Sequence, residues 1–118
     1  MSFHPFVGDR RLLARMYAEA SCVVMPGAYE TFGLVALEAA ASGARVVACA
    51  SAPCGALVGS LADTFEPGDC DGLVRAIAHA RSRVPDLHAA DQLAASFTWE
   101  RALSAELDDI SRLVRRAP

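Results

Sequence analysis

The stretch Pro26–Gly43, which reads PGAYETFGLVALEAAASG, is the most informative part of this chain. It follows an apolar run, Cys22–Met25, that reads as a buried strand. It then passes through a Pro-Gly turn into an alanine-rich helical pattern that ends at Gly43. A strand, a loop and a helix N-terminus in this order favour an α/β fold with a parallel sheet.

The start of that helix is suited to holding a phosphate or a sugar. The first amides of a helix have no partners within the helix, and the aligned peptide dipoles make this end positive. We expect these amides to be those of residues 31–34, and Gly33 has no side chain to keep a ligand from the backbone. A phosphate or diphosphate fits such an end.

Two carboxylates bracket the helix start, Glu30 in the loop and Glu38 within the helix. Both would repel a phosphate, so the neutral hydroxyls of a sugar or a ribose are better ligands for them. The pattern therefore predicts a nucleotide sugar as the ligand. The structural alternatives are that Glu30 caps the amides of Gly33 and Leu34, and that Glu38 pairs with an arginine such as Arg45.

The run Glu30–Glu38, followed by Ala39–Gly43 and the strand Arg45–Ala48, resembles the E-x7-E signature of retaining glycosyltransferases of family 4. The resemblance continues through Phe65–Asp69 and Phe97–Glu100 and covers most of the chain. The amino-acid sequence of the loop is similar to that of mannosyltransferase-like members of the family. In that family the fold is GT-B, two facing Rossmann-like domains, and the signature lies in the C-terminal, donor-binding domain.

The resemblance implies transfer of a hexosyl group from a nucleoside-diphosphate sugar, such as GDP-mannose or UDP-glucose, to an acceptor hydroxyl. It implies retention at the anomeric carbon and no obligatory metal or other cofactor. Carried over by position, Glu38 would bind the ribose hydroxyls. Glu30 would bind the donor sugar as an orienting group, or act as a nucleophile or general base. The sugar hydroxyls or the diphosphate would be held by the amides of Thr31, Phe32, Gly33 and Leu34.

Two departures from the family pattern bear on activity. Ala56 stands where the family has a glutamate, in the loop after the strand at 45–49. A GT-B donor domain also has further βα units ahead of the region that corresponds to Met1, and the acceptor domain precedes those units. We therefore expect residues 1–118 to form a single, partial C-terminal domain that is completed by the missing N-terminal domain or by a partner chain, with a homodimer as one form. The alternative is a non-catalytic module that binds a nucleotide sugar or completes a partner subunit.

Composition excludes several other function classes. A chain of 118 residues forms one domain at most, and a net charge of -3 argues against a nucleic-acid-binding surface. All 11 basic residues are arginine, so a Walker-type lysine and Schiff-base chemistry are excluded. No Gly-x-Gly-x-x-Gly run is present, which argues against a dinucleotide-dependent oxidoreductase.

The expected location is cytoplasmic, and peripheral to the membrane in a complete enzyme. No apolar run approaches the roughly 20 residues that span a bilayer, and the N-terminus lacks the pattern of a secretory signal. The 4 cysteines are irregularly spaced, so we expect free thiols rather than a zinc site.

The remaining segments predict strands that alternate with helices. We expect a short strand within Met1–Val7 and strands at 45–49 and 63–66, the last two separated by a loop and a short helical turn. A helix capped by Asp9 should cover the sheet. We expect its residues Arg10 and Arg11 to be solvated; the alternative is that one of them lines a phosphate cleft.

Three further helices are predicted toward the C-terminus. The first is capped by Asp69 or Asp71, with Leu73, Val74, Ile77 and Ala78 on one face, and the second begins at Asp86. Thr98 should cap the last helix, whose apolar stripe is Trp99, Leu103, Leu107, Ile110 and Val114.

Overall fold

Three short parallel strands form the centre of the computed structural model, which describes residues 1–116. The strands are β1 (Val23–Met25), β2 (Val46–Cys49) and β3 (Ala62–Phe65), and they lie side by side in that order. Val46 is opposite Val23 on one side and Ala62 on the other. The predicted α/β fold with a Rossmann-like parallel sheet is confirmed.

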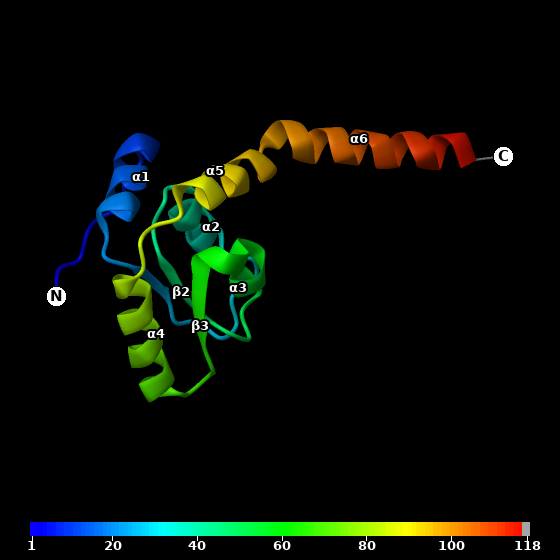
Figure 1. The fold of residues 1–118 in the computed structure, drawn as a ribbon. Coiled ribbons are helices and arrows are strands. Elements are labelled where there is room, and N and C mark those ends of the chain that lie inside the picture. The colour runs from blue at the N-terminus through cyan, green and yellow to red at the C-terminus, as the bar shows by residue number, and fades with distance from the viewer. Residues whose placement is uncertain (117–118) are drawn as a thin grey trace.

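Helices cover both faces of this sheet (Figure 1). The helices α2 (Leu34–Ala41) and α3 (Pro53–Val58) pack against each other and against the strands, and α4 (Cys70–Ser82) packs against β3 and β2 from the other side. All residues of β2 are buried as a result, which explains why this strand is a continuous apolar run.

The N-terminal segment differs from the prediction. Residues 1–9 form no strand, and Phe3 and Phe6 are almost fully exposed. Two aromatic residues favour an extended conformation, but a strand needs a neighbouring strand for its hydrogen bonds, and none lies beside this segment in the described part of the chain.

The first helix, α1 (Arg10–Glu19), begins as predicted but packs elsewhere. The Asp9 carboxylate accepts hydrogen bonds from the amides of Arg11, at 2.8 Å, and Leu12, at 3.2 Å. The helix packs against α2 rather than over the sheet, and none of its residues is buried. The prediction that it covers the sheet was therefore wrong.

The segments after β2 follow the predicted order. A short helix, α3, and a 3-10 turn (Gly59–Leu61) lead into β3, and Asp69 caps α4 by accepting a hydrogen bond from the amide of Gly72 at 2.7 Å. Ala76 and Ala80 form the buried face of α4, and the predicted Leu73 and Ile77 pack against the core beside them. Val74 and Ala78, also predicted on that face, are exposed.

The C-terminal end of α4 is held to the sheet by polar side chains. The guanidinium of Arg45 donates hydrogen bonds to the carbonyl oxygens of Arg83, at 2.9 Å, and Arg81, at 3.4 Å. The Asp63 carboxylate on β3 contacts His79 and Arg83, at 2.7 Å and 2.9 Å. These contacts fix the turn between α4 and the next helix, α5 (Leu87–Ser96), which Asp86 caps as predicted.

The last helix, α6 (Trp99–Arg116), extends away from the body of the molecule as an arm (Figure 1). The amide of Arg101 donates a hydrogen bond to the Thr98 hydroxyl, so the predicted cap is confirmed. Among the helices of residues 1–116, none combines the length and the apolarity that a bilayer span requires.

Candidate functional site

The loops that follow the strands meet at one edge of the sheet, where the carboxyl ends of parallel strands lie together. The loop after β1 carries Glu30 and leads into α2. It is tied to the loop after β2, because the Ser51 hydroxyl donates a hydrogen bond to the carbonyl oxygen of Ala28 at 3.1 Å. This edge therefore presents Glu30 and the start of α2 on one connected surface.

Packing requires a glycine at position 33, the N-cap of α2, for a reason that the sequence did not reveal. Its backbone is left-handed, with φ 81° and ψ 45°, and it is buried. A Cβ placed there would overlap the Cβ of Cys54 on α3. Glycine is thus needed for the close packing of α2 on α3, whether or not a ligand approaches the backbone.

The left-handed turn at Gly33 also moves the helix start along the chain. Helix α2 begins at Leu34, and the amides of Ala36 and Leu37 already donate to the carbonyl oxygen of Gly33. The amides at the open helix end are therefore those of Leu34 and Val35. Thr31 and Phe32 lie in the loop before the helix, so their amides are loop donors rather than the helix amides we expected.

Glu30 is half-buried and lies in the loop between β1 and α2. Burial raises the pKa of the Cys54 thiol, and the nearby negative charge of Glu30 adds to that rise. Within residues 1–116, no side chain caps the N-terminus of α2, so the alternative in which Glu30 caps the amides of Gly33 and Leu34 was wrong.

Glu38 lies in the second turn of α2, exposed, between the buried residues Leu37 and Ala39. Its carboxylate is next to Tyr17 of α1: burial raises the pKa of the Tyr17 hydroxyl, and Glu38 adds to the rise by favouring the protonated phenol. The alternative of an ion pair with Arg45 was wrong, because the Arg45 guanidinium binds carbonyl oxygens at the end of α4.

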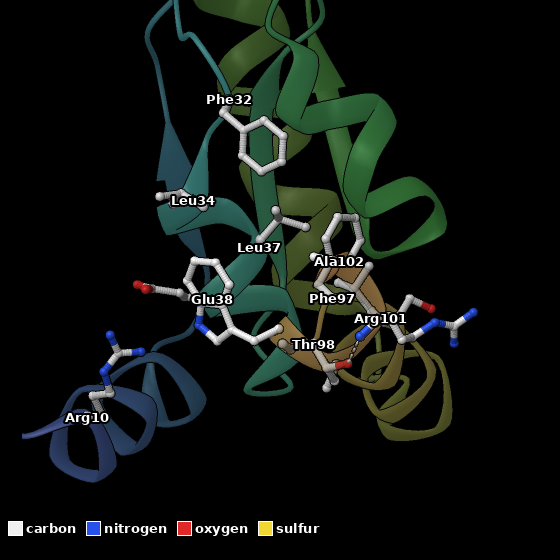
Figure 2. A pocket seen from close by; sticks show the side chains of 14 residues that line it. Arg10, Phe32, Leu34, Leu37, Glu38, Phe97, Thr98, Arg101 and Ala102 are labelled. Atoms are coloured by element: carbon white, nitrogen blue, oxygen red, sulfur yellow. Dashed lines mark hydrogen bonds between the residues drawn. The ribbon is translucent and has the colours of Figure 1, made fainter. Parts of the chain in front are cut away.

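A pocket of about 750 Å³ lies beside Glu38, between α2 and the junction of α5 with α6. Figure 2 shows Phe32, Leu34 and Glu38 on one wall, Phe97 and Arg101 on the facing wall, and Arg10 of α1 at the rim near Glu38. The other lining residues are Leu37, Ala41, Leu93, Ala94, Ser96, Thr98, Trp99 and Ala102.

The pocket brings together half of the predicted site. Phe32, Leu34 and Glu38 line it, whereas Glu30, Thr31 and Gly33 do not. Arg10 is exposed, as expected, and it also lines the pocket. Phe97, Trp99 and Arg101 line the pocket but were not predicted as site residues. The run Phe97–Glu100 carried part of the resemblance, and Thr98 and Trp99 were assigned only a helix cap and a position in the apolar stripe.

The chain is similar to known proteins over most of its length. Residues 1–82 match the family model described as "Glycosyl transferases group 1". The chain is 34% identical over 114 residues to the GDP-mannose-dependent alpha-(1-6)-phosphatidylinositol dimannoside mannosyltransferase of Mycobacterium tuberculosis. This match covers 91% of this chain and 29% of the relative. It is 40% identical over 119 residues to the D-inositol 3-phosphate glycosyltransferase of Streptomyces griseus, covering 90% of this chain and 24% of the relative.

The match is limited to one part of these relatives. The chain spans 29% and 24% of the lengths of the two proteins just named. No solved structure matches the chain significantly.

Proposed function

The chain belongs to the group 1 family of glycosyl transferases, and on this premise we propose that it is the donor-binding part of a retaining enzyme that uses a nucleoside-diphosphate sugar. Such an enzyme moves a hexosyl group from the donor to an acceptor hydroxyl. The supporting observation is that Glu30 and the open N-terminal end of α2 share the carboxyl edge of the sheet, while Glu38 lies one helical turn further, at the wall of a pocket.

In this proposal the ligand follows the helix from its N-terminus toward Glu38. The amides of Leu34 and Val35, with those of Thr31, Phe32 and Gly33 before them, hold the diphosphate or the sugar hydroxyls at the positive end of the dipole. They also stabilise the negative charge that develops on the leaving diphosphate. The Glu38 carboxylate accepts hydrogen bonds from the ribose hydroxyls, and Glu30 orients the donor sugar.

The proposed donor is GDP-mannose, with UDP-glucose as the second choice. The Mycobacterium tuberculosis relative is named for its dependence on GDP-mannose. We further propose that no metal is required, since the helix N-terminus and an arginine such as Arg10, at the pocket rim, supply positive charge for a diphosphate.

Residues 1–118 are proposed to act as a single, partial domain completed by a further region or by a partner chain. Within the described residues, β1 pairs with β2 on one side only, and its residues are half-buried. This open edge also suits the alternative function, a non-catalytic module that binds a nucleotide sugar or completes a partner subunit. A cytoplasmic location, peripheral to the membrane in a complete enzyme, stays a prediction.

Calorimetric titration of the 118-residue chain with GDP, UDP, GDP-mannose and UDP-glucose tests the proposal. Saturable binding that Glu38→Gln weakens, and that the matched control Glu106→Gln on the exposed α6 leaves unchanged, would support it. Titration in the presence of a chelator should give the same affinity. If a folded chain binds none of these ligands at millimolar concentration, the donor site is not formed by these residues. If it binds but gives no transfer with any added partner region, the non-catalytic alternative is favoured.

A further inference from the structure

The hydroxyl of Ser51 ties the loop that carries Glu30 to the rest of the sheet edge. This loop, residues 26–32, runs from β1 to the N-cap of α2. Ser51 follows β2 and donates a hydrogen bond to the carbonyl oxygen of Ala28 at 3.1 Å. Within the described structure, no other hydrogen bond joins residues 26–32 to another segment of the chain. The position of the middle of the loop therefore depends on one hydroxyl group.

Ser51 is itself held by the buried end of β2. The Sγ atom of Cys49, which is buried, lies 3.4 Å from the Oγ atom of Ser51. A hydroxyl has one proton to donate, and a carbonyl oxygen such as that of Ala28 can only accept it. The Cys49 thiol is therefore the donor to Ser51. The three groups form a chain of hydrogen bonds that runs from the core to the loop and fixes the direction of the exposed Ser51 hydroxyl.

The end of the loop has a separate anchor. Gly33 packs against Cys54 of α3 so closely that a Cβ would not fit between them. This contact holds the N-terminus of α2 and does not involve Ser51. Glu30 lies between the two anchors, two residues after Ala28 and three before Gly33. Loss of the Ser51 hydroxyl should therefore displace Glu30 more than the amides at the start of the helix.

We propose that Ser51 is a positioning residue for the hexose of the donor, and that it acts by holding the Glu30 carboxylate in place. The role assigned to Ser51 rests on the proposed function, in which Glu30 orients the sugar and the start of α2 holds the diphosphate. A loop that is already ordered loses less conformational freedom when the ligand binds. Ser51 should therefore affect the affinity for the hexose part of the donor and not the affinity for the nucleoside diphosphate.

Calorimetric titration of the 118-residue chain with the donor and with its nucleotide tests the proposal. The pair used is the one that the unmodified chain prefers, GDP-mannose with GDP or UDP-glucose with UDP. Ser51→Ala should weaken the donor by about threefold to tenfold, as expected for one hydrogen bond, and should leave the nucleotide unchanged. An equal loss for both ligands, or no loss for either, would overturn the proposal.

Two further variants control for the substitution itself. Ser51→Thr keeps the hydroxyl and should bind both ligands as the unmodified chain does. Ser60→Ala removes an exposed hydroxyl from the turn before β3, at the opposite edge of the sheet, and should change neither affinity. Circular dichroism verifies that all variants are folded.

A double variant tests whether Ser51 acts through Glu30. Once Glu30→Ala has removed the carboxylate, Ser51→Ala should cause no further loss of donor affinity, because the group that it positions is absent. Additive losses would show that Ser51 reaches the ligand by another route, and they would contradict the assigned role.

A measurement without ligand tests the tether alone. In two-dimensional amide NMR spectra, Ser51→Ala should shift the signals of residues 28–32 and leave those of α2 in place. Unchanged loop signals would refute the tether, and equal shifts in the loop and in α2 would refute the separate anchors.

Failure of the role of Ser51 can be told apart from failure of the donor site. If Glu30→Ala weakens the donor but Ser51→Ala does not, the role of Ser51 alone is wrong. If the unmodified chain binds none of these ligands, or if Glu30→Ala leaves the donor affinity unchanged, the proposed function is wrong and the role of Ser51 falls with it.

Discussion

The guanidinium of Arg45 donates a hydrogen bond to the carbonyl oxygen of Arg83, 2.9 Å away, and so joins the start of β2 to the end of α4. We expect Arg45→Met to lower the free energy of unfolding by about 1.5–3 kcal/mol, because a charged donor is lost and carbonyl groups at the helix end lose their partner. Urea denaturation measures this. Arg75→Met, which removes an exposed ion pair with Asp69, should cost less than about 1 kcal/mol. Equal losses in the two variants would contradict the interpretation.

Gly33 gives a second stability prediction. Gly33→Ala should lower the free energy of unfolding by about 2 kcal/mol or more, because alanine is strained at positive φ and its Cβ would overlap Cys54. The control is Gly27→Ala in the same loop, where an added Cβ meets nothing within 4 Å. Thermal unfolding of both variants provides the comparison, and a neutral Gly33→Ala would show that α2 and α3 can separate at little cost.

The raised pKa of Tyr17 predicts a pH dependence. The folded state favours the neutral phenol, so the unfolded chain loses this proton at lower pH, near the ordinary value of 10.0. The stabilisation is thus fully present below that pH and is lost as pH rises through the folded pKa. In Tyr17→Phe, the part of the alkaline fall that is due to this group should be absent.

Ultraviolet absorbance tests the cause of the shift. In a Tyr29→Phe background, Tyr17 is the only tyrosine. Adding Glu38→Gln should lower the pKa of Tyr17 part of the way toward its ordinary value, since burial, the larger cause, is unchanged. An unchanged titration curve would show that the Glu38 carboxylate does not influence Tyr17.

The proposed roles of the two carboxylates predict different binding losses. Glu38→Gln should weaken GDP and GDP-mannose alike, by about 1.5–3 kcal/mol or roughly 10-fold to 150-fold, because the ribose is common to both. Glu30→Gln should weaken GDP-mannose only, because GDP has no hexose. Competition calorimetry with both ligands separates the two roles. A uniform loss from both variants would mean that the assigned roles are wrong.

Local chemistry made the helices predictable from the sequence. Four helices begin with a side chain that accepts a hydrogen bond from an amide two or three residues later in the chain; these residues are Asp9, Asp69, Asp86 and Thr98. Such caps can be predicted from a sequence because the two partners are close together in it. The continuous apolar run of β2 likewise follows from its position between helices on both faces.

The features that the sequence did not reveal depend on contacts between distant segments. Gly33 is required by Cys54, which lies on another helix, and Phe97 and Trp99 join the pocket only because the start of α6 lies beside α2. The failed strand at residues 1–7 has the same cause, since a strand depends on a neighbour. The α6 stripe was predicted correctly, but its exposure is a property of the surroundings rather than of the helix.

The position of β2 between two strands has a consequence for how the molecule opens. It is the one strand with hydrogen-bonded neighbours on both sides in the described structure, and its residues are all buried. Its amides are bonded to strands on both sides and lie under helices on both faces, so we expect them to exchange with solvent more slowly than those of β1 and β3, which lie at the edges of the described sheet. Hydrogen-deuterium exchange would therefore rank β2 as the most protected of the three strands.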